Sequence, residues 1–405
     1  MPIATPRRSR RLPSARHAWC AALLALTTPW APAADWVWSS GPFLPGTTAP
    51  QPMPASDTLF VLPGGDKFFD GVAFESFGAV SMGDPLTLQD GATVVNHGLW
   101  DAIGDFGLTD GGGAASSFVN HGTLRKSAGG GISQIAGGVG FVNHGTVASF
   151  SGTVVVGAGS SFEDGSRFSG SGIVRSLTGN SFRGTLHSEN LRLNLGDLPG
   201  ATHHGIGATI RGQVSWEGGA MSGTWAVDTG QALVVPSSTG ATKRLVGAST
   251  ELVVEGRLAW NAPAALSLEQ GARLVNAGLL ELDYTVAGNV SFGGDGSAGH
   301  SLVNAATGTL RMVPATRTLT VAAGAGFVSA GGTLDTQGTM LFSGGSRFEH
   351  GTRFSGSGQV VADGHNVFAG AFDSANLALR GGTHDGEGAL ARGTVVWTGG
   401  DLTGT

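Results

Sequence analysis

The sequence predicts an all-β protein, a right-handed parallel β-helix in which short strands stack coil upon coil. Two observations favour this solenoid: a short unit that recurs at steps of 24 and 23 residues, and a tandem duplication of about 180 residues that lies on top of it. Glycine contributes 70 of the 405 residues, as expected for a chain that bends at short intervals. The composition is far from that of an ordinary globular domain.

Residues 1–33 predict a secretory signal peptide. Residues 1–17 contain five arginines and no acidic residue, and an apolar stretch from Ala18 to Leu26 follows. Ala31-Pro32-Ala33 then supplies a small-x-small cleavage pattern. The apolar stretch is too short to span a bilayer. We therefore expect an exported protein that resides at the cell surface or outside the cell, with the periplasm as a further destination.

The composition of the mature chain excludes several kinds of chemistry. The single cysteine, Cys20, lies inside the signal, so no disulfide or thiolate is expected after cleavage. Loss of the five signal arginines leaves 18 basic against 29 acidic residues, a formal charge of −11. Nucleic acid is therefore not expected as a partner. Because no later segment has the length of a membrane span, we expect an outer-membrane anchor or secretion partner to be encoded elsewhere.

Residues 34–83 stand apart from the repeats. Five prolines between Pro42 and Pro54 predict an extended leader, and Thr58–Leu62 follows as the first expected strand. Because the open end of a solenoid must be covered, we assign this Pro-rich region to an N-terminal cap.

The short unit consists of an apolar pair, an Asn-x-Gly turn and a further apolar residue. Asn and Gly tolerate a positive φ, so Asn-His-Gly between two β-prone runs predicts a turn that joins strands. A period in the low twenties corresponds to one coil. The clearest units are Val94–Leu99, Phe118–Thr123 and Phe141–Thr146, with related units at 274–279, 302–304 and 327–331.

The long repeat pairs residues 84–224 with residues 264–405, and residues 225–263 keep the strand-like alternation as bridging coils. Its clearest match aligns Phe162–Gly172 with Phe348–Gly358. Apolar residues and glycines recur between the copies, whereas charged residues mostly do not. This is expected of stacked coils, which bury apolar side chains against their neighbours and leave outward positions free to vary. We expect about 15 coils of about 20 to 25 residues each, with separate β-sandwich domains as the structural alternative.

The Asn-x-Gly-Thr units, the Ser-Gly-Ser-Gly bends and the Trp-x-Gly-Gly units resemble the β-helical passenger regions of Gram-negative autotransporters and filamentous-haemagglutinin-type surface proteins. The resemblance covers residues 84–405. It implies an exported surface or secreted scaffold, adhesin-like or stalk-like, with glycans or proteins of a host or cell surface as partners. Such stalks also carry proteases or act as inert spacers. An autotransporter would end in a membrane barrel, whereas this chain stops at Thr405 inside a repeat unit.

Several polar residues are candidates for binding. If each coil is one period, His97, His121 and His144 stack about 4.8 Å apart, close enough for two of them to share a metal ion. The second copy has alanine in place of two of these histidines, so an exposed turn is the favoured interpretation. His203-His204 and His384-Asp385 are interpreted in the same way, as polar loops. The asparagines of the turns predict a turn ladder in which each side chain bonds neighbouring backbone: Asn96, Asn120 and Asn143.

A secreted carbohydrate-active enzyme, a polysaccharide lyase or hydrolase, is the alternative function. Such a site needs a carboxylate pair, or a base with cationic partners, in a groove. Trp216 and Trp397 are candidate sugar platforms, but their recurrence beside Gly-Gly favours packing, and Gly293–Gly296 echoes a calcium-binding nonapeptide only once. We predict a protein that is not an enzyme, with no catalytic, cofactor-binding or metal-binding residue. The only lysines available to such a site are Lys67, Lys126 and Lys243.

The last coil, around Val395–Leu402, is expected to expose unpaired strand edges, because Thr405 has no successor in the sequence. Uncovered edges invite pairing with another chain. Self-association through this open coil is therefore a further expectation.

Overall fold

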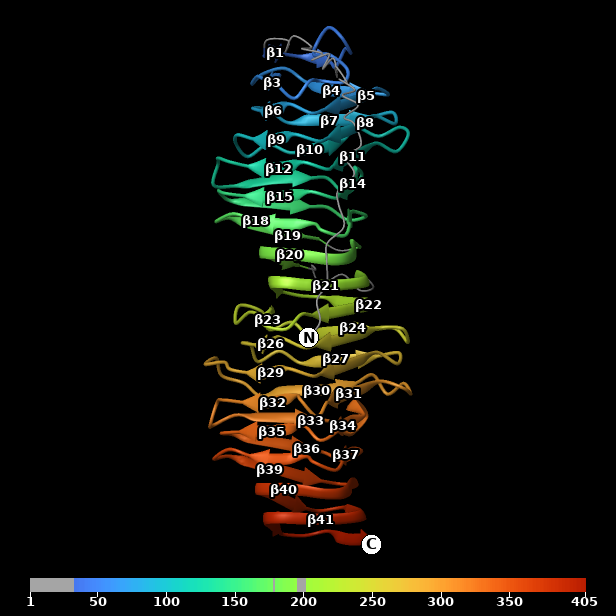
Figure 1. Cartoon of the computed structure of the whole chain (residues 1–405), viewed down its shortest axis with the longest axis vertical. Helices are drawn as coiled ribbons and strands as arrows, with labels where there is room; N and C mark the ends of the chain where they lie inside the picture. The colour runs from blue at the N-terminus through green and yellow to red at the C-terminus, as the bar shows by residue number, and fades with distance from the viewer. Residues whose placement is uncertain (1–32, 178, 195–201) are drawn as a thin grey trace, which may run out of the picture. The chain divides into compact units, whose positions relative to one another are not determined.

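The computed structural model describes residues 33–177, 179–194 and 202–405. The predicted signal peptide, including Cys20, lies outside the described residues except for Ala33. Residues 33–405 form a parallel β-solenoid of about 17 turns, in which strands stack from β1 to β42 (Figure 1). The predicted all-β parallel solenoid is confirmed, and about 15 coils was an underestimate. The right-handed sense and the duplication stay predictions.

The strands form three ladders, which we call the first, second and third faces, and all pairings are parallel. The first face contains β2 Gly41–Pro42, β4 Lys67–Asp70, β7 Leu86–Gln89, β10 Leu108–Asp110, β13 Ile132–Ile135, β16 Thr153–Val156, β19 Ile173–Ser176, β23 Ala232–Val235, β26 Arg257–Trp260, β29 Leu279–Leu282, β32 Thr309–Met312, β35 Thr333–Thr336 and β38 Arg353–Ser355.

The second face contains β5 Ala73–Ser76, β8 Thr93–Asn96, β11 Ser117–Asn120, β14 Gly140–Asn143, β17 Ser161–Phe162, β24 Lys243–Val246, β27 Leu266–Glu269, β30 Val290–Gly294, β33 Thr318–Val321, β36 Thr339–Phe342 and β39 Gln359–Asp363. The third face contains β1 Asp35–Trp38, β3 Thr58–Val61, β6 Ala79–Met82, β9 Leu99–Ala102, β12 Thr123–Lys126, β15 Thr146–Ser149, β18 Arg167–Ser169, β25 Glu251–Val254, β28 Arg273–Asn276, β31 Ser301–Asn304, β34 Phe327–Ser329 and β37 Ser346–Phe348.

Six further strands complete the solenoid, and several of them bend through more than one face without an intervening loop. Two of them, β20 and β40, each pair with three strands of the preceding coil at once. They are β20 Ser181–Leu193, β21 Thr202–Trp216, β22 Ala220–Val227, β40 Asn366–Arg380, β41 Thr383–Trp397 and β42 Asp401–Gly404, and the one short 3-10 helix of the described residues is η1 Ala323–Ala325.

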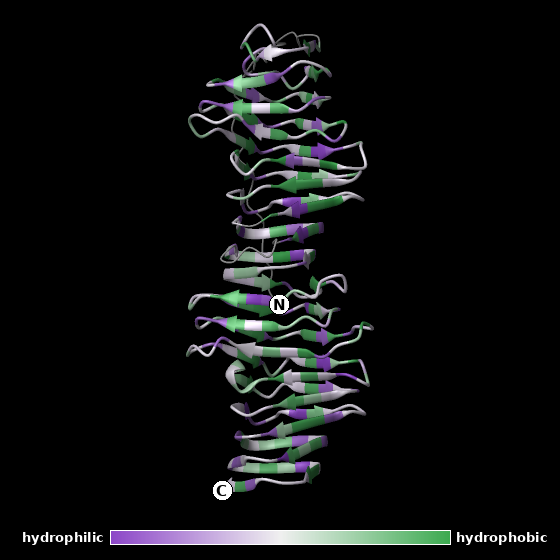
Figure 2. Ribbon diagram, turned by 180° about the vertical axis from the view of Figure 1, so that it is seen from behind, coloured by the Kyte–Doolittle hydropathy of each residue, from purple (hydrophilic) through white to green (hydrophobic). Residues whose placement is uncertain are grey.

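Alternation along each strand builds the core. In β8, Val94 and Asn96 are buried, while Thr93 and Val95 face outward and are half-buried. Figure 2 shows hydrophobic and hydrophilic residues interspersed along the strands of every part of the solenoid. Because the side-chain period of a strand is two, one set of residues from every coil fills the interior of the solenoid. A column of phenylalanines on the second face stacks through consecutive coils: Phe118, Phe141, Phe162 and Phe182.

The N-terminal region differs from its prediction. The predicted strand at Thr58–Leu62 corresponds to β3, Thr58–Val61, but it is not the first strand, since β1 already pairs with it in parallel register. Within the segment expected to be an extended leader, Phe43 and Met53 are buried in the core. Apolar residues between the prolines therefore fold this segment into the first turn. Its role as a cap stays a prediction.

The Asn-His-Gly turns are also built differently from the expectation. Gly122 does not adopt a positive φ; a Cβ atom placed there would lie 2.1 Å from the carbonyl oxygen of Gly98 in the preceding coil. Gly98 and Gly145 are in the same position relative to the coils before them. Close stacking of the turns, rather than left-handed backbone, therefore requires glycine here.

Matching sequence units of the two proposed copies lie on different faces. The Asn-x-Gly unit is on the second face in β8, β11 and β14, and on the third face in β28, where the related Leu302–Asn304 unit of β31 pairs with it. The change arises in β20–β22, where the third-face ladder continues from β18 through β20, β21 and β22 to β25 and β28. The bridging strands β23–β26 continue the ladders without a break. Matching units of the two copies are therefore displaced by one face.

Candidate functional site

The three turn histidines form a stack on one edge of the solenoid. The ring centroids of His97 and His121 are 5.0 Å apart, and those of His121 and His144 are 4.7 Å apart, with nearly parallel planes. Phe77 extends the stack beyond His97, whose Nε2 lies 2.9 Å from Glu75 Oε1. Burial, followed by the proximity of the two neighbouring histidines, lowers the pKa of His121. Parallel rings direct their nitrogen lone pairs side by side instead of toward one point, which disfavours a shared metal ion.

The asparagine ladder is confirmed. Asn96 Nδ2 donates to Asn120 Oδ1 over 2.8 Å, and Asn120 Nδ2 donates to Asn143 Oδ1 over 2.7 Å. Each amide also reaches a carbonyl of its own turn, as in the contact from Asn120 Nδ2 to Gly122 O. The three side chains are buried. A buried amide ladder fixes the register of the coils, because a slip would leave its polar atoms without partners.

The prediction of polar loops at His203-His204 and His384-Asp385 was wrong. Both pairs lie within long strands, β21 and β41, so one histidine of each pair points into the core. His203 is fully buried, and burial lowers its pKa to about 3. Neither ring nitrogen of His203 or His384 has a hydrogen-bond partner in the described part of the chain. These buried rings serve packing.

All three lysines are buried, each with its ammonium group beside carbonyl oxygens of a turn. Lys126 Nζ contacts Gly104 O at 2.9 Å, Ala128 O at 2.8 Å and Asp105 Oδ1 at 2.6 Å. Lys67 contacts two turn carbonyls and Asp84, and Lys243 contacts Glu217 O and Ala241 O. The lysines therefore stabilise turns from the inside and do not line a groove.

The tryptophans beside Gly-Gly both close a turn through the indole N–H. Trp216 is buried and donates to Gly219 O, whereas Trp397, in the last turn, is 59% exposed and donates to Gly400 O. Asp295, in the calcium-like segment, accepts hydrogen bonds from Ser297 within its own loop. Val396 and Leu402 of the last turn are exposed as well, and self-association there stays a prediction.

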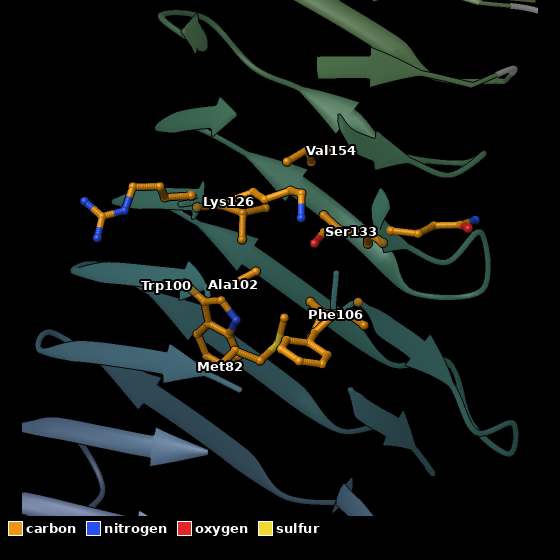
Figure 3. Close-up of a pocket in the computed structure, with 13 residues that line it drawn as sticks. Met82, Trp100, Ala102, Phe106, Lys126, Ser133 and Val154 are labelled. Atoms are coloured by element: carbon orange, nitrogen blue, oxygen red, sulfur yellow. The ribbon is translucent and has the colours of Figure 1, made fainter. Parts of the chain in front are cut away.

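A small internal cavity of about 20 Å³ lies between the coils of β9 and β13 (Figure 3). In this view Trp100 and Phe106 lie on one side of it, and Lys126 and Ser133 on the other. The indole nitrogen of Trp100 is buried without a hydrogen-bond partner in the described residues. Since a buried water needs at least about 10–15 Å³, the cavity has room for one water molecule and is too small for an organic ligand.

Outward charges in neighbouring coils usually alternate in sign, which the sequence did not reveal. Arg125 NH2 lies 2.5 Å from Asp101 Oδ2 in the coil before it. On the first face, Glu281, Arg311 and Asp335 follow one another in register, and Arg311 Nε lies 2.9 Å from Asp335 Oδ2. Alternation of sign is expected, because like charges directly opposite each other on a sheet are destabilising.

This alternation is broken in two places. On the first face, Arg175 of β19 is paired in register with Arg192 of β20, and Glu217 contacts both guanidinium groups, at 3.9 Å and 2.7 Å.

The other break is a column on the third face. Arg167 of β18, His187 of β20 and Arg211 of β21 are directly paired in register, and these strands lie one above the other in Figure 1. Arg167 has no ion-pair partner in the described residues, and the side chain of His187 makes no hydrogen bond there. Arg211 Nε contacts Asp228 Oδ2 at 2.9 Å. Two guanidinium groups thus flank an unpaired imidazole.

The column lines an open groove of about 570 Å³, which is the candidate functional site. The groove also contains hydroxyl, amide and carboxylate groups, which can bond sugar hydroxyls. Gln231 Oε1 is held by the backbone N–H of Gly212 at 2.6 Å, and Glu189 Oε2 accepts a long hydrogen bond of 3.4 Å from Gly170 N. The remaining lining residues are Thr146, Phe168, Ser169 and Ser188.

The matching column of the second copy is self-neutralised. Arg353, Asp373 and Arg392 are paired in register on the first face, so aspartate stands where the first copy has His187. Arg353 Nε lies 3.8 Å from Asp373 Oδ2. Ala375 takes the place of Glu189. The same scaffold therefore carries a cationic column in one copy and an alternating column in the other.

This groove was not predicted from the sequence. Its three basic residues are 20 and 24 residues apart, so they align only once the length of each coil is known. The Arg-Phe-Ser-Gly-Ser-Gly segment that contains Arg167 is repeated at Arg353. The sequence signal for the groove is the difference at the next position of the column, where the first copy has His187 and the second has Asp373. Comparison of outward positions alone, coil by coil, would have found it.

Comparisons with known proteins add no further assignment. No protein-family model matches the chain, and neither the curated proteins nor the solved structures contain a match. Within the described ranges, no group of three or more His, Cys, Asp and Glu side chains is placed to hold a metal ion. The part of the chain that the structure describes also contains no helix with the length and apolar character of a membrane span.

Proposed function

We propose that this protein is an exported scaffold of the cell surface or the extracellular medium, adhesin-like or stalk-like, and that it is not an enzyme. The observation that carries the proposal is the unbroken stack of about 17 parallel turns. Such a solenoid is quasi-one-dimensional, so it holds a binding surface at a distance from its point of attachment. At about 4.8 Å per turn the stack extends roughly 80 Å. The resemblance to autotransporter and filamentous-haemagglutinin-type passengers and the predicted signal peptide support the same proposal.

Export is tested by producing residues 1–405 in a Gram-negative host and comparing them with residues 34–405, which lack the signal. We expect the full chain outside the cytoplasm with a new N-terminus near Ala34 or Asp35, and the shorter chain inside. Retention of the full chain in the cytoplasm with an intact N-terminus would contradict export. X-ray scattering of the purified chain should give the profile of a rod.

The alternative function, a secreted carbohydrate-active enzyme, is favoured by one feature of the groove. His187 lies between two arginines, and a base with cationic partners is what a polysaccharide lyase needs. A panel of polysaccharides incubated with the protein distinguishes the two functions. Shortening of a polymer that is lost on His187→Ala would favour the enzyme, and unchanged polymer length supports the scaffold.

A further inference from the structure

We infer that the groove formed by β18, β20 and β21 binds a carboxylated glycan, and that the column of Arg167, His187 and Arg211 recognises its acidic sugars. The inference rests on the proposed role as a surface scaffold and names the class of its ligand. Three observations support it: the break in charge alternation, the polar groups that line the groove, and the neutralised column of the second copy.

The charges of the column point to an anion. Arg167 and His187 lack carboxylate partners in the described residues, whereas Arg211 is paired with Asp228. The guanidinium group of Arg167 therefore has no negative charge opposite it on the sheet. A ligand carboxylate between Arg167 and His187 supplies that charge. Arginine is well suited to this contact, because its guanidinium group binds a carboxylate through two parallel hydrogen bonds.

The other groups of the groove point to a sugar and not to a dense polyanion. Glu189 lines the same groove and repels every anionic group that comes close to it, so a ligand with charges on each sugar is disfavoured more than one with a charge on every second sugar. Glu189, Gln231 and the hydroxyl groups of Thr146 and Ser169 offer hydrogen bonds to a ligand rich in hydroxyl groups. A linear glycan in which acidic sugars alternate with neutral ones satisfies both sets of groups. Rungs about 4.8 Å apart offer such a chain repeated contacts along the stack.

The second copy shows that the cationic column is not needed for folding. Asp373 occupies the position of His187 between Arg353 and Arg392, and the turns around it are intact. The packing of the coils therefore tolerates a column in which charges alternate. The unneutralised column of the first copy is not required for folding. The second copy also provides matched control positions in the same molecule.

The test is the binding of hyaluronan oligosaccharides, which carry one carboxylate on every second sugar, measured by calorimetry with heparin and neutral dextran oligosaccharides as comparisons. We expect hyaluronan to bind more tightly than heparin and dextran not to bind. Arg167→Ala and His187→Asp should each weaken hyaluronan binding at least about tenfold, which is about 1.4 kcal/mol. Arg353→Ala is the matched control and should leave binding unchanged. Circular dichroism and thermal melting check that each variant folds.

Each other outcome overturns the inference. Absence of hyaluronan binding, equal affinity for heparin, unchanged binding by Arg167→Ala, or an equal loss from Arg353→Ala would place the recognition elsewhere. Shortening of hyaluronan during the measurement would show that the protein cleaves the polymer, and the groove would then be an active site instead of a binding site. The proposed scaffold function is tested separately by export, so a surface-exposed protein whose groove does not bind hyaluronan keeps the function and loses the inference.

Discussion

Acid should destabilise the solenoid at a defined place, the coil that contains His203. The ring is fully buried against Phe182, with ring centroids 5.7 Å apart, and burial lowers the pKa of His203 from 6.5 to about 3. The native state therefore keeps the ring neutral, while the unfolded chain takes up a proton below pH 6.5. Because the unfolded state binds more protons, stability falls as the pH decreases.

The magnitude follows from the size of the shift. One pKa unit corresponds to about 1.4 kcal/mol, so the loss is about 2 kcal/mol at pH 5, about 4 kcal/mol at pH 3 and about 5 kcal/mol well below pH 3. Above pH 6.5 the ring is neutral in both states and contributes no pH dependence. His203→Leu removes the titrating group and should abolish this component. At pH 7 the same substitution should be neutral or stabilising, because it also removes a buried ring without hydrogen bonds.

The assay is hydrogen exchange of β21 amides at pH 7 and pH 5, corrected for intrinsic exchange rates, since coils of a solenoid open locally. His204→Leu is the matched control: His204 is the exposed neighbour on the same strand, with Nδ1 3.1 Å from Ser222 Oγ. We expect wild type and His204→Leu to lose protection at pH 5, and His203→Leu to keep it. An equal loss of protection in His203→Leu would refute this reasoning.

Three further predictions concern the interior of the stack. Asn120→Leu interrupts the amide ladder and should lower the free energy of unfolding by about 2–4 kcal/mol, measured by denaturant titration, since it leaves neighbouring buried amides without partners. Gly122→Ala should lower the melting temperature strongly, because its Cβ meets a carbonyl oxygen, whereas Gly130→Ala, with open space around the added Cβ, should not. The three lysines are buried, so an amine-acylating reagent should not modify Lys67, Lys126 or Lys243 until the protein is denatured, as judged by mass spectrometry. Rapid labelling of the native protein at these lysines would contradict their burial.

The architecture was predictable because a solenoid repeats its packing in the sequence. The alternation around Val94 and the recurrence of Asn-x-Gly identified strands, turns and the asparagine ladder before any contact was known. The packing role predicted from the Gly-Gly context is confirmed for Trp216, which is buried, but is wrong for Trp397, which is 59% exposed. In each confirmed case the residue type is fixed by the coil above or below, so stacking leaves a periodic trace.

The histidines of β21 and the groove could not be predicted in the same way. Whether His203 or His204 points inward depends on the register of a strand that lacks the short repeat, and a shift of one residue exchanges the two. The contact between Arg167 and His187 depends on a coil of 20 residues, and the next contact, to Arg211, on one of 24. Such lengths are set by loops, which vary without a periodic signal.

The displacement of the two copies by one face limits how the protein can meet a ligand. The column of Arg167, His187 and Arg211 lies on the third face, and its counterpart of Arg353, Asp373 and Arg392 lies on the first. A straight polymer laid along the third face therefore meets the first column only. The second column lies on the first face, which this polymer does not reach. Asp373 neutralises that column, so the first face carries no matching cationic patch. Stacking constrains the inward residues of both copies, so the proposed recognition depends on outward residues that differ between them.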